Sequence, residues 1–206
     1  MASLSPVPAP DVHAYVRSAL PPPPARVLEI GAGDGSLARA LREAGYDVTA
    51  VDPMAEPGSG VEPIPLHAVD APPGHFDAAV AIVSLHHVVP LGESLRRLSE
   101  VMRHGARLVV DEMDLAAYDA RAVVWWLGHS KVDKQPQDLI AALQEHIQPV
   151  WRIREELAAW FDVGEPVPGA YLYRWKIDPA LRGEEEQLIA EGVIPAVGKR
   201  FVAVRR

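Results

Sequence analysis

The stretch from Arg26 to Gly35, RVLEIGAGDG, constrains the fold more than any other part of the chain. A short apolar run ends in a turn with glycines at every second position, and the helical pattern SLARALREAG follows directly. Glycines can adopt positive φ angles and let a ligand approach the backbone closely. The N-terminus of the next helix offers N–H groups without intrahelical partners. The stretch therefore predicts a strand, a ligand-binding turn and a helix.

Further apolar segments predict a sheet around this turn. Four of them follow in order: YDVTAVD (46–52), a short run at 66–69, FDAAVAIVSL (76–85) and ARLVV (106–110). Helical patterns follow the first and fourth strands, whereas 53–65 and 71–75 are rich in proline and glycine. This alternation is typical of an α/β fold with a parallel sheet, here with reduced crossover helices after strands two and three. GAYLYRWKI (169–177) and GKRFVAVRR (198–206) predict an antiparallel pair at the C-terminal sheet edge.

The domain organisation follows from the same pattern. Residues 1–24 are predicted to be a lead-in, with a short helix capped by Asp11 and four consecutive prolines, 21–24. Residues 25–206 are predicted to form a single domain. Within it, 114–169 contains three helical patterns, and all five tryptophans lie between Trp125 and Trp175.

Composition excludes several classes of protein. The 206 residues carry a formal net charge of −8 and no cysteine, which rules out disulfides and thiolate metal sites. No long Lys/Arg block gives the basic surface that nucleic-acid binding favours. No apolar run has membrane-spanning length, and MASLSPVPAP lacks the blocks of a signal peptide. We therefore expect no nucleic-acid partner, no membrane partner and a cytoplasmic location.

The glycine turn is used by two classes of nucleoside-binding protein. A dinucleotide site has the pattern G-x-G-x-x-G, but here Ser36 occupies the place of the third glycine. Glu29, two residues before Gly31, would repel a pyrophosphate. An acid there suits a cationic nucleoside without phosphates, such as S-adenosylmethionine. An NAD-dependent oxidoreductase stays the less favoured alternative.

VLEIGAGDG is similar to the first motif of class I S-adenosylmethionine-dependent methyltransferases, and FDAAVAIVSLHHV resembles the fourth-strand segment of their small-molecule type. The resemblance covers 26–114. It implies a Rossmann-like, doubly wound, mostly parallel seven-stranded sheet. It also implies methyl transfer from S-adenosylmethionine to a small-molecule acceptor. A cofactor-binding but non-catalytic or regulatory protein of the same fold is the alternative.

The resemblance implies a set of cofactor-binding residues. Beside the methionine part it places Glu29, Gly31, Ala32 and Gly33, and the end of the fourth strand adds Ser84 and Leu85. It implies that Asp52 binds the ribose, with Pro53 next to the adenine, and that Asp70 and Ala71 meet the adenine edge. The alternative for Asp70 is that it only ends a strand.

Histidine suits general-base catalysis because its pKa lies near the working pH. Histidines 86 and 87 end the fourth strand, where ligands of such sheets bind, and His87 is the preferred base; His146 is a third candidate. The alternative is that one histidine packs against the sheet. Neighbouring side chains on a strand point to opposite faces, so His86 and His87 are poorly placed as joint metal ligands, and no metal is expected. Asp111 and Glu112 either shape the site or are solvated.

The segment 114–169 is predicted to recognise the substrate, since aromatic side chains offer flat apolar walls. Alternatively, most of its tryptophans only cover the sheet. The reduced crossovers leave part of the sheet to be covered by the N-terminal segment, by the loop 53–65 or by a second subunit. A homodimer is therefore one open alternative. The sequence identifies neither the substrate nor whether its acceptor atom is O, N or C.

Overall fold

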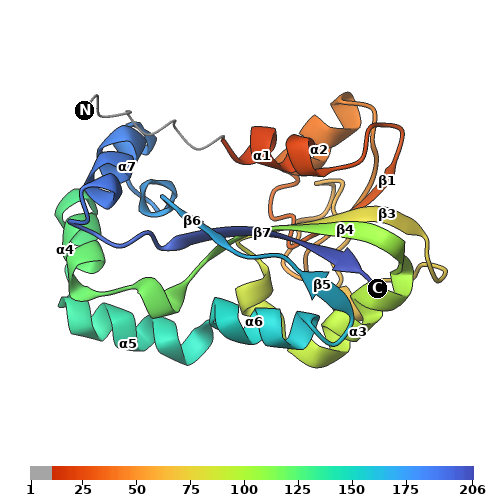
Figure 1. Cartoon of the computed structure of the whole chain (residues 1–206). Helices are drawn as coiled ribbons and strands as arrows, with labels where there is room; N and C mark the ends of the chain where they lie inside the picture. Colours follow the sequence, from red (N-terminus) through yellow and green to blue (C-terminus); the bar gives the residue numbers. More distant parts are fainter. Residues whose placement is uncertain (1–10) are drawn as a thin grey trace, which may run out of the picture.

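One mixed sheet organises the molecule (Figure 1). The computed structural model describes residues 11–206, apart from the side chains at positions 144 and 146. The strand order is β2-β1-β3-β4-β7-β5, and β6 also pairs with β7. The seven strands are β1 Arg26–Ile30, β2 Asp47–Val51, β3 Phe76–Ile82, β4 Met102–Met113, β5 Phe161–Val163, β6 Val167–Gly169 and β7 Gly198–Arg205.

The pairing of these strands confirms the predicted Rossmann-like α/β class. Strands β2, β1, β3 and β4 are parallel, and β7 is antiparallel to β4, β5 and β6. The antiparallel strand lies between β4 and the two short strands, one place further into the sheet than the sequence predicted. Because parallel strands end at the same edge, the carboxyl ends of β1, β2, β3 and β4 meet there, and this edge holds the candidate site.

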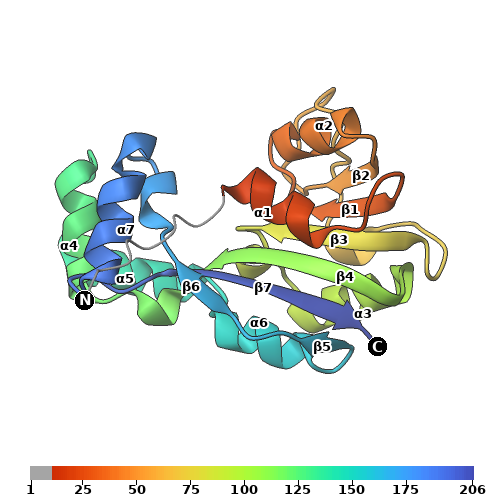
Figure 2. The ribbon, with the colours of Figure 1, turned by 45° about the horizontal axis from the view of Figure 1, so that its top comes forward.

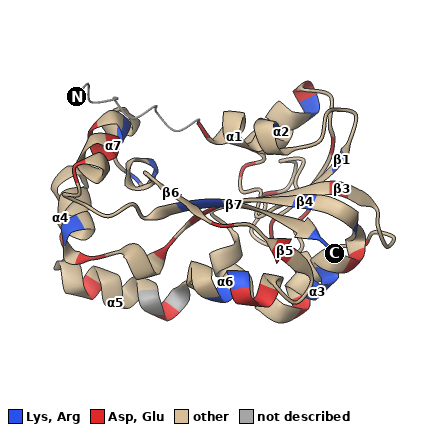
Figure 3. Ribbon diagram, in the orientation of Figure 1, with Lys and Arg blue, Asp and Glu red and all other residues tan. Residues whose placement is uncertain are grey.

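The helices cover both faces of the sheet (Figures 1 and 2). On one face lie α1 Val12–Ala19 and α2 Ser36–Glu43, and on the other lie α3 Leu91–Val101 and α6 Val150–Leu157. Charges of both signs are interspersed along α3 and α6 (Figure 3). At one end of the sheet gather α4 Ala120–His129, α5 Pro136–His146 and α7 Arg182–Ala190. The three helical patterns predicted in 114–169 are present as α4, α5 and α6.

The predicted strand at 66–69 is wrong. Leu66–Ala68 forms a short 3₁₀ turn, and only an isolated bridge between Val51 and Glu62 extends the sheet beyond β2. The N–H groups of Ala68 and Val69 donate to the carbonyls of Pro65 and Leu66 within this turn, so they are not available to a strand ladder. The absence of an α-helix between β2 and β3 agrees with the predicted reduction of the crossovers.

The predicted strand at 169–177 is also largely wrong. Only its first residue, Gly169, belongs to β6, and Leu172–Arg174 forms a 3₁₀ turn. The reason is a competing acceptor: the carboxylate of Glu185 on α7 accepts the backbone N–H groups of residues 171, 172 and 173 at 2.8, 2.9 and 2.8 Å. Those N–H groups are therefore lost to a strand ladder.

Residues from the N-terminal helix and the loop after β2 fill space that crossover helices would occupy. Asp11 caps α1 as predicted, and Val16 of that helix is fully buried. The Tyr15 hydroxyl donates to the carbonyls of Val110 and Phe201, which anchors α1 on the sheet. Val61 is 7 % exposed and packs in the same hydrophobic cluster as α1 and α2. The homodimer stays a prediction.

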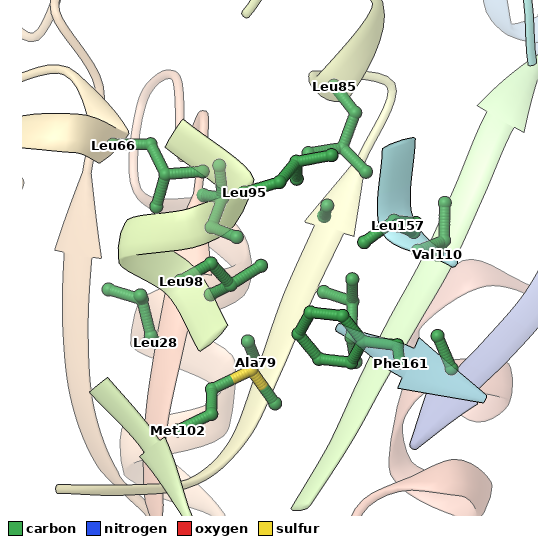
Figure 4. Close-up of a cluster of buried hydrophobic side chains, with 14 of the residues drawn as sticks. Leu28, Leu66, Ala79, Leu85, Leu95, Leu98, Met102, Val110, Leu157 and Phe161 are labelled. Carbon is green, nitrogen blue, oxygen red and sulfur yellow. The ribbon is translucent and has the colours of Figure 1, made fainter. Parts of the chain in front are cut away.

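The larger hydrophobic core lies between the sheet and the α3–α6 layer. Figure 4 shows leucines of α3 packed against the strands, with Phe161 of β5 and Leu157 of α6 beside them. Burial of such side chains stabilises the fold by about 1.5–3 kcal/mol each. The core thereby fixes the sheet, and the candidate site lies at the carboxyl ends of the parallel strands of that sheet. The cluster's labelled members are Leu28, Leu66, Ala79, Leu85, Leu95, Leu98, Met102, Val110, Leu157 and Phe161.

Helix α6 offers a matched test of this core. Ile153 is fully buried, whereas Trp151, two residues earlier on the same helix, is 60 % exposed. Ile153→Ala removes buried carbon and leaves a cavity, so the free energy of unfolding falls by about 2–5 kcal/mol. Trp151→Ala changes it by about 1 kcal/mol or less. Urea denaturation measures both, and equal losses for the two variants would contradict this packing.

Candidate functional site

The glycine turn after β1 lies against the end of β3. Gly31, Gly33 and Gly35 all have positive φ, at 67°, 54° and 71°. The N–H groups of Gly31 and Ala32 donate to the carbonyl of Val51 at 2.8 and 3.1 Å, which ties the turn to β2. A Cβ atom at position 31 would lie 2.3 Å from Cβ of Ser84. Only glycine therefore lets the turn approach the next strand this closely.

Glu29 is a buried carboxylate with an unsatisfied oxygen. Its side chain lies on β1 just before the turn, it is 4 % exposed, and its Oε2 atom accepts no hydrogen bond from the described residues. Burial raises the pKa of Glu29 to about 7; Arg42 lowers it and Asp34 raises it further. A buried oxygen that lacks a donor fits a ligand that brings a positively charged N–H group.

Asp52 directly follows β2, and hydrogen bonds orient both of its carboxylate oxygens. Oδ2 accepts the N–H of Gly33 at 2.9 Å, and Oδ1 accepts the N–H of Met54 at 2.8 Å. Each carboxylate oxygen has two lone pairs, so both can still accept a hydrogen bond from a ligand hydroxyl. The sequence-predicted pair of Glu29 and Asp52 therefore flanks the glycine turn, and these two hydrogen-bond acceptors fit a cationic nucleoside.

Three neighbouring cavities lie near the glycine turn and the end of β3. The first, about 370 Å³, is bordered by Gly31, Asp52, Pro53 and Ser84 among others. The second, about 660 Å³, runs from Glu29 and the glycine turn to the start of α1 and to Arg174. The third, about 340 Å³, is lined by Val83, His86, His87, Met113, Ala142, Leu143, Ile147, Tyr171 and Trp175.

The cavities share particular lining residues. Gly31 borders the first and the second, whereas Val83 and His87 border the first and the third. A ligand that extends over Gly31 through the first two cavities would therefore pass the entrance to the third at the end of β3. This arrangement suits a reaction between a bound nucleoside and a separate small molecule.

A buried acid holds the turn after β3. The Glu112 side chain is fully buried at the end of β4, and its Oε1 accepts the N–H groups of Ser84 and Leu85 at 2.8 and 2.6 Å. Its Oε2 lies 2.6 Å from Nδ1 of His86. The preceding residue, Val83, has φ of 53°, a strained angle for a β-branched side chain. Glu112 is thus structural in its contacts rather than solvated.

The two adjacent histidines occupy different environments. His86 is 3 % exposed and its Nδ1 is paired with Glu112, so it matches the buried alternative raised by the sequence. His87 is exposed and borders both the first and the third cavity. Their ring centroids are 4.1 Å apart. The side chain of His146 lies outside the described part of the structure, so its predicted role stays a prediction.

Several predicted contacts do not border these cavities. Asp70 is exposed and Ala71 is half-buried; Arg97 on α3 holds the chain here by donating to the carbonyls of Val69 and Ala71. Leu85 is fully buried in the larger core. Neither Asp70, Ala71 nor Leu85 lines a described cavity, and ligand contact by these three stays a prediction. Ala32, in contrast, borders the second cavity.

The predicted recognition segment, 114–169, supplies part of the lining of the third cavity, and its role in substrate recognition stays a prediction. Ala142, Leu143 and Ile147 line this cavity from within the segment, and Tyr171 and Trp175 line it from just beyond. Trp126 is core: it stacks on Trp175 with ring centroids 4.2 Å apart. Trp125 donates to Glu184 of α7 instead of facing the cavities. The strand predicted at 169–177 gave no indication that Tyr171 lines this cavity.

No group of three or more His, Cys, Asp or Glu side chains in the described part of the chain is arranged to hold a metal ion. Across residues 11–206 no helix is long and apolar enough to cross a membrane.

Comparison with known proteins places the chain in a family. Residues 9–162 match the model of a family described as a methyltransferase domain. Over 187 aligned residues the chain is 26 % identical to a ubiquinone biosynthesis O-methyltransferase of Xanthomonas campestris pv. campestris, covering 72 % of this chain and 77 % of that protein.

Two solved structures have a similar fold. An S-adenosylmethionine-dependent methyltransferase from Mesorhizobium loti is 17 % identical with a TM-score of 0.62, covering 93 % of this chain and 96 % of that one. The 1,6-didemethyltoxoflavin-N1-methyltransferase of Burkholderia thailandensis, solved with its substrate and S-adenosylhomocysteine, is 20 % identical with a TM-score of 0.54, covering 94 % and 74 %.

The fold is that of class I S-adenosylmethionine-dependent methyltransferases. The chain belongs to the methyltransferase-domain family, because the family match spans most of its length. The predictions of family, methyltransferase activity and cofactor are thereby confirmed.

The raised pKa of Glu29 predicts a pH-dependent stability. The carboxyl group loses its proton near pH 4.5 in the unfolded chain and near pH 7 in the folded one, so stability falls as pH rises between these values. Glu29→Gln removes this loss and stabilises the ligand-free protein at pH 8 by up to about 3 kcal/mol. Urea denaturation at pH 4 and pH 8 measures the difference.

The same variant also lacks the charge that fits a cation, so it binds S-adenosylmethionine more weakly in calorimetry. Glu43→Gln, an exposed glutamate at the end of α2, is the matched control and should change neither quantity. A Glu29→Gln protein that is less stable than the wild type at pH 8 would contradict the account of Glu29.

The close approach of the turn predicts unequal effects at two glycines. Gly31→Ala combines a strained φ with a clash against Ser84, and costs about 3 kcal/mol or more. Gly33→Ala has the strained φ, but its Cβ meets nothing within 4 Å, so it costs about 1–2 kcal/mol. Thermal unfolding of both variants measures this difference. Similar losses of stability would contradict the predicted clash, because they would show that Ser84 shifts at little cost.

Proposed function

We propose that this methyltransferase acts on a small, uncharged acceptor bound in the third cavity, and that His87 is its general base. The observation that carries the proposal is the proximity of the three cavities near the end of β3. The first two suit the adenosine and amino-acid parts of the cofactor, and the third opens beside them at Val83 and His87.

The chain has residues that would hold S-adenosylmethionine. Glu29 lies where it can pair with the positively charged amino group, and Asp52 where it can bind ribose hydroxyls. Gly31 leaves room for the ligand to pass over the backbone. When bound, the cofactor would supply a methyl group on a positively charged sulfur. The acceptor's lone pair forms a bond to the methyl carbon while the carbon–sulfur bond breaks, and the sulfur compound leaves as a neutral thioether.

The lining of the third cavity supports an uncharged acceptor. None of its described lining residues is Asp, Glu, Lys or Arg, and Tyr171 and Trp175 add aromatic surface. A charged substrate would be desolvated there without a partner. These walls favour a molecule with a flat apolar body and one O–H or N–H group. The Xanthomonas relative is named for O-methylation and the Burkholderia neighbour for N-methylation, and we leave the acceptor atom open between them.

The protein's part in the reaction is to align the acceptor, exclude water and take up one proton. Neutral His87 can accept the proton of the acceptor's O–H or N–H group, since it borders both the cofactor cavity and the acceptor cavity. His86 is less suited because its Nδ1 is already engaged by Glu112. His146 is the third candidate, on the helix that lines the same cavity.

The test is methylation of a panel of small hydroxylated and aminated ring compounds, followed with radiolabelled S-adenosylmethionine. His87→Asn should lower kcat by about 10²–10⁴-fold and leave the affinity for S-adenosylhomocysteine within a factor of two. His104→Asn, an exposed histidine on β4, is the matched control and should keep full activity.

Two outcomes would refute parts of this proposal. Full activity of His87→Asn would remove His87 as the base. Cofactor binding without methylation of any panel member would favour the non-catalytic alternative, whereas failure to bind S-adenosylhomocysteine would refute the site itself.

A further inference from the structure

The second cavity is lined by charges of both signs. Glu29 and the glycine turn border it, and so does Arg174, from the 3₁₀ turn between β6 and α7. The amino-acid part of S-adenosylmethionine is a zwitterion with an ammonium and a carboxylate on the same carbon. A cavity that binds this zwitterion tightly therefore pairs an acid with the ammonium and a cation with the carboxylate.

Arg174 is held in place by a buried ion-pair network. Its Nη1 lies 3.0 Å from Oδ1 of Asp111, which is 2 % exposed at the end of β4. The other oxygen of Asp111 accepts Nε of Arg200 at 2.9 Å. Figure 3 shows the basic segment of β7 to which Arg200 belongs. One buried carboxylate is therefore shared by two guanidinium groups.

The backbone that carries Arg174 is also fixed. The carboxylate of Glu185, which is fully buried, accepts the three N–H groups that precede Arg174 in the chain. The N–H of Arg174 itself donates to the carbonyl of Tyr171 at 2.9 Å. Its guanidinium carbon lies 5.3 Å from the centroid of the Tyr171 ring. The cation is thus positioned before any ligand arrives, which lowers the entropy lost on binding.

A guanidinium has N–H donors to spare in this arrangement. Arg174 donates from Nη1 to Asp111, whereas its Nε and Nη2 atoms donate to no acceptor among the described residues. Its side chain is 19 % exposed at the edge of the cavity. An arginine whose Nε and Nη2 nitrogens both remain as donors can bind a carboxylate in the bidentate manner that this side chain favours.

We propose that Arg174 binds the carboxylate of the cofactor's amino-acid part, opposite the ammonium group at Glu29. The inference rests on the proposed cofactor site and assigns to it a residue about 140 positions downstream of the glycine turn. The role of Arg174 is selective: it distinguishes S-adenosyl compounds that retain the carboxylate from nucleosides that lack it.

The test compares two ligands by isothermal titration calorimetry on the full chain. S-adenosylhomocysteine has the carboxylate, and 5′-deoxy-5′-methylthioadenosine lacks the whole amino-acid part. Arg174→Gln should weaken S-adenosylhomocysteine binding at least tenfold and leave 5′-methylthioadenosine binding within a factor of two. Arg174→Lys, which keeps the charge, should recover part of the loss. Circular dichroism and the thermal midpoint establish that each variant is folded.

Arg182→Gln is the matched control, since Arg182 borders the same cavity but is paired with Glu186 at 2.8 Å. It should leave the ratio of the two affinities at the wild-type value. Equal losses for both ligands in Arg174→Gln would show that Arg174 only supports the turn, and no loss would show that it does not reach the ligand; either overturns the inference. A wild-type chain that binds 5′-methylthioadenosine but not S-adenosylhomocysteine also overturns it. Binding of neither ligand would refute the cofactor site as well.

Discussion

The carboxylate of Glu112 is the interaction on which the arrangement of the site depends. A fully buried acid loses its hydration, and only well-placed donors compensate for that loss. Here the donors are two backbone N–H groups of the turn after β3 and Nδ1 of His86. The acid at the end of one strand therefore fixes the path of the chain at the end of its neighbour, and with it the positions of Ser84 and His87 at the junction of the cavities.

The glycine turn after β1 packs closely against the turn after β3. Parallel pairing of β1 with β3 places Glu29 beside Val80 and Ile30 beside Ala81, so the chain after β1 emerges next to the chain after β3. A side chain at position 31 would collide with Ser84. The need for glycine is thus a consequence of two strand ends that share one edge. A shift in either turn would be transmitted to the other through this contact.

The parts of the site that the sequence predicted are those encoded locally. Glu29 lies in a strand whose pattern is legible over a few residues, and the glycine turn, Asp52 and the paired histidines each follow such a strand. The two wrong strand predictions failed because other acceptors take up the backbone N–H groups. Within 66–69 these groups bond locally to the carbonyls of residues 65 and 66, whereas in 171–173 they bond to the carboxylate of Glu185, 12 to 14 residues away. The roles of Glu112 and Arg174 could not be predicted, because each acts through a partner 26 to 63 residues away.

The buried glutamates of this protein differ in whether the protein itself supplies hydrogen-bond donors to their carboxylate oxygens. Both oxygens of Glu112 are engaged by donors of the protein, and the same is true of Glu185. Glu29 is also buried, at 4 % exposed, yet one of its oxygens has no donor among the described residues. A buried carboxylate with its donors in place contributes to the fold, whereas one without them destabilises the protein until a cation binds. This contrast, more than the glycine pattern alone, is the physical reason for assigning the ammonium group of the cofactor to Glu29.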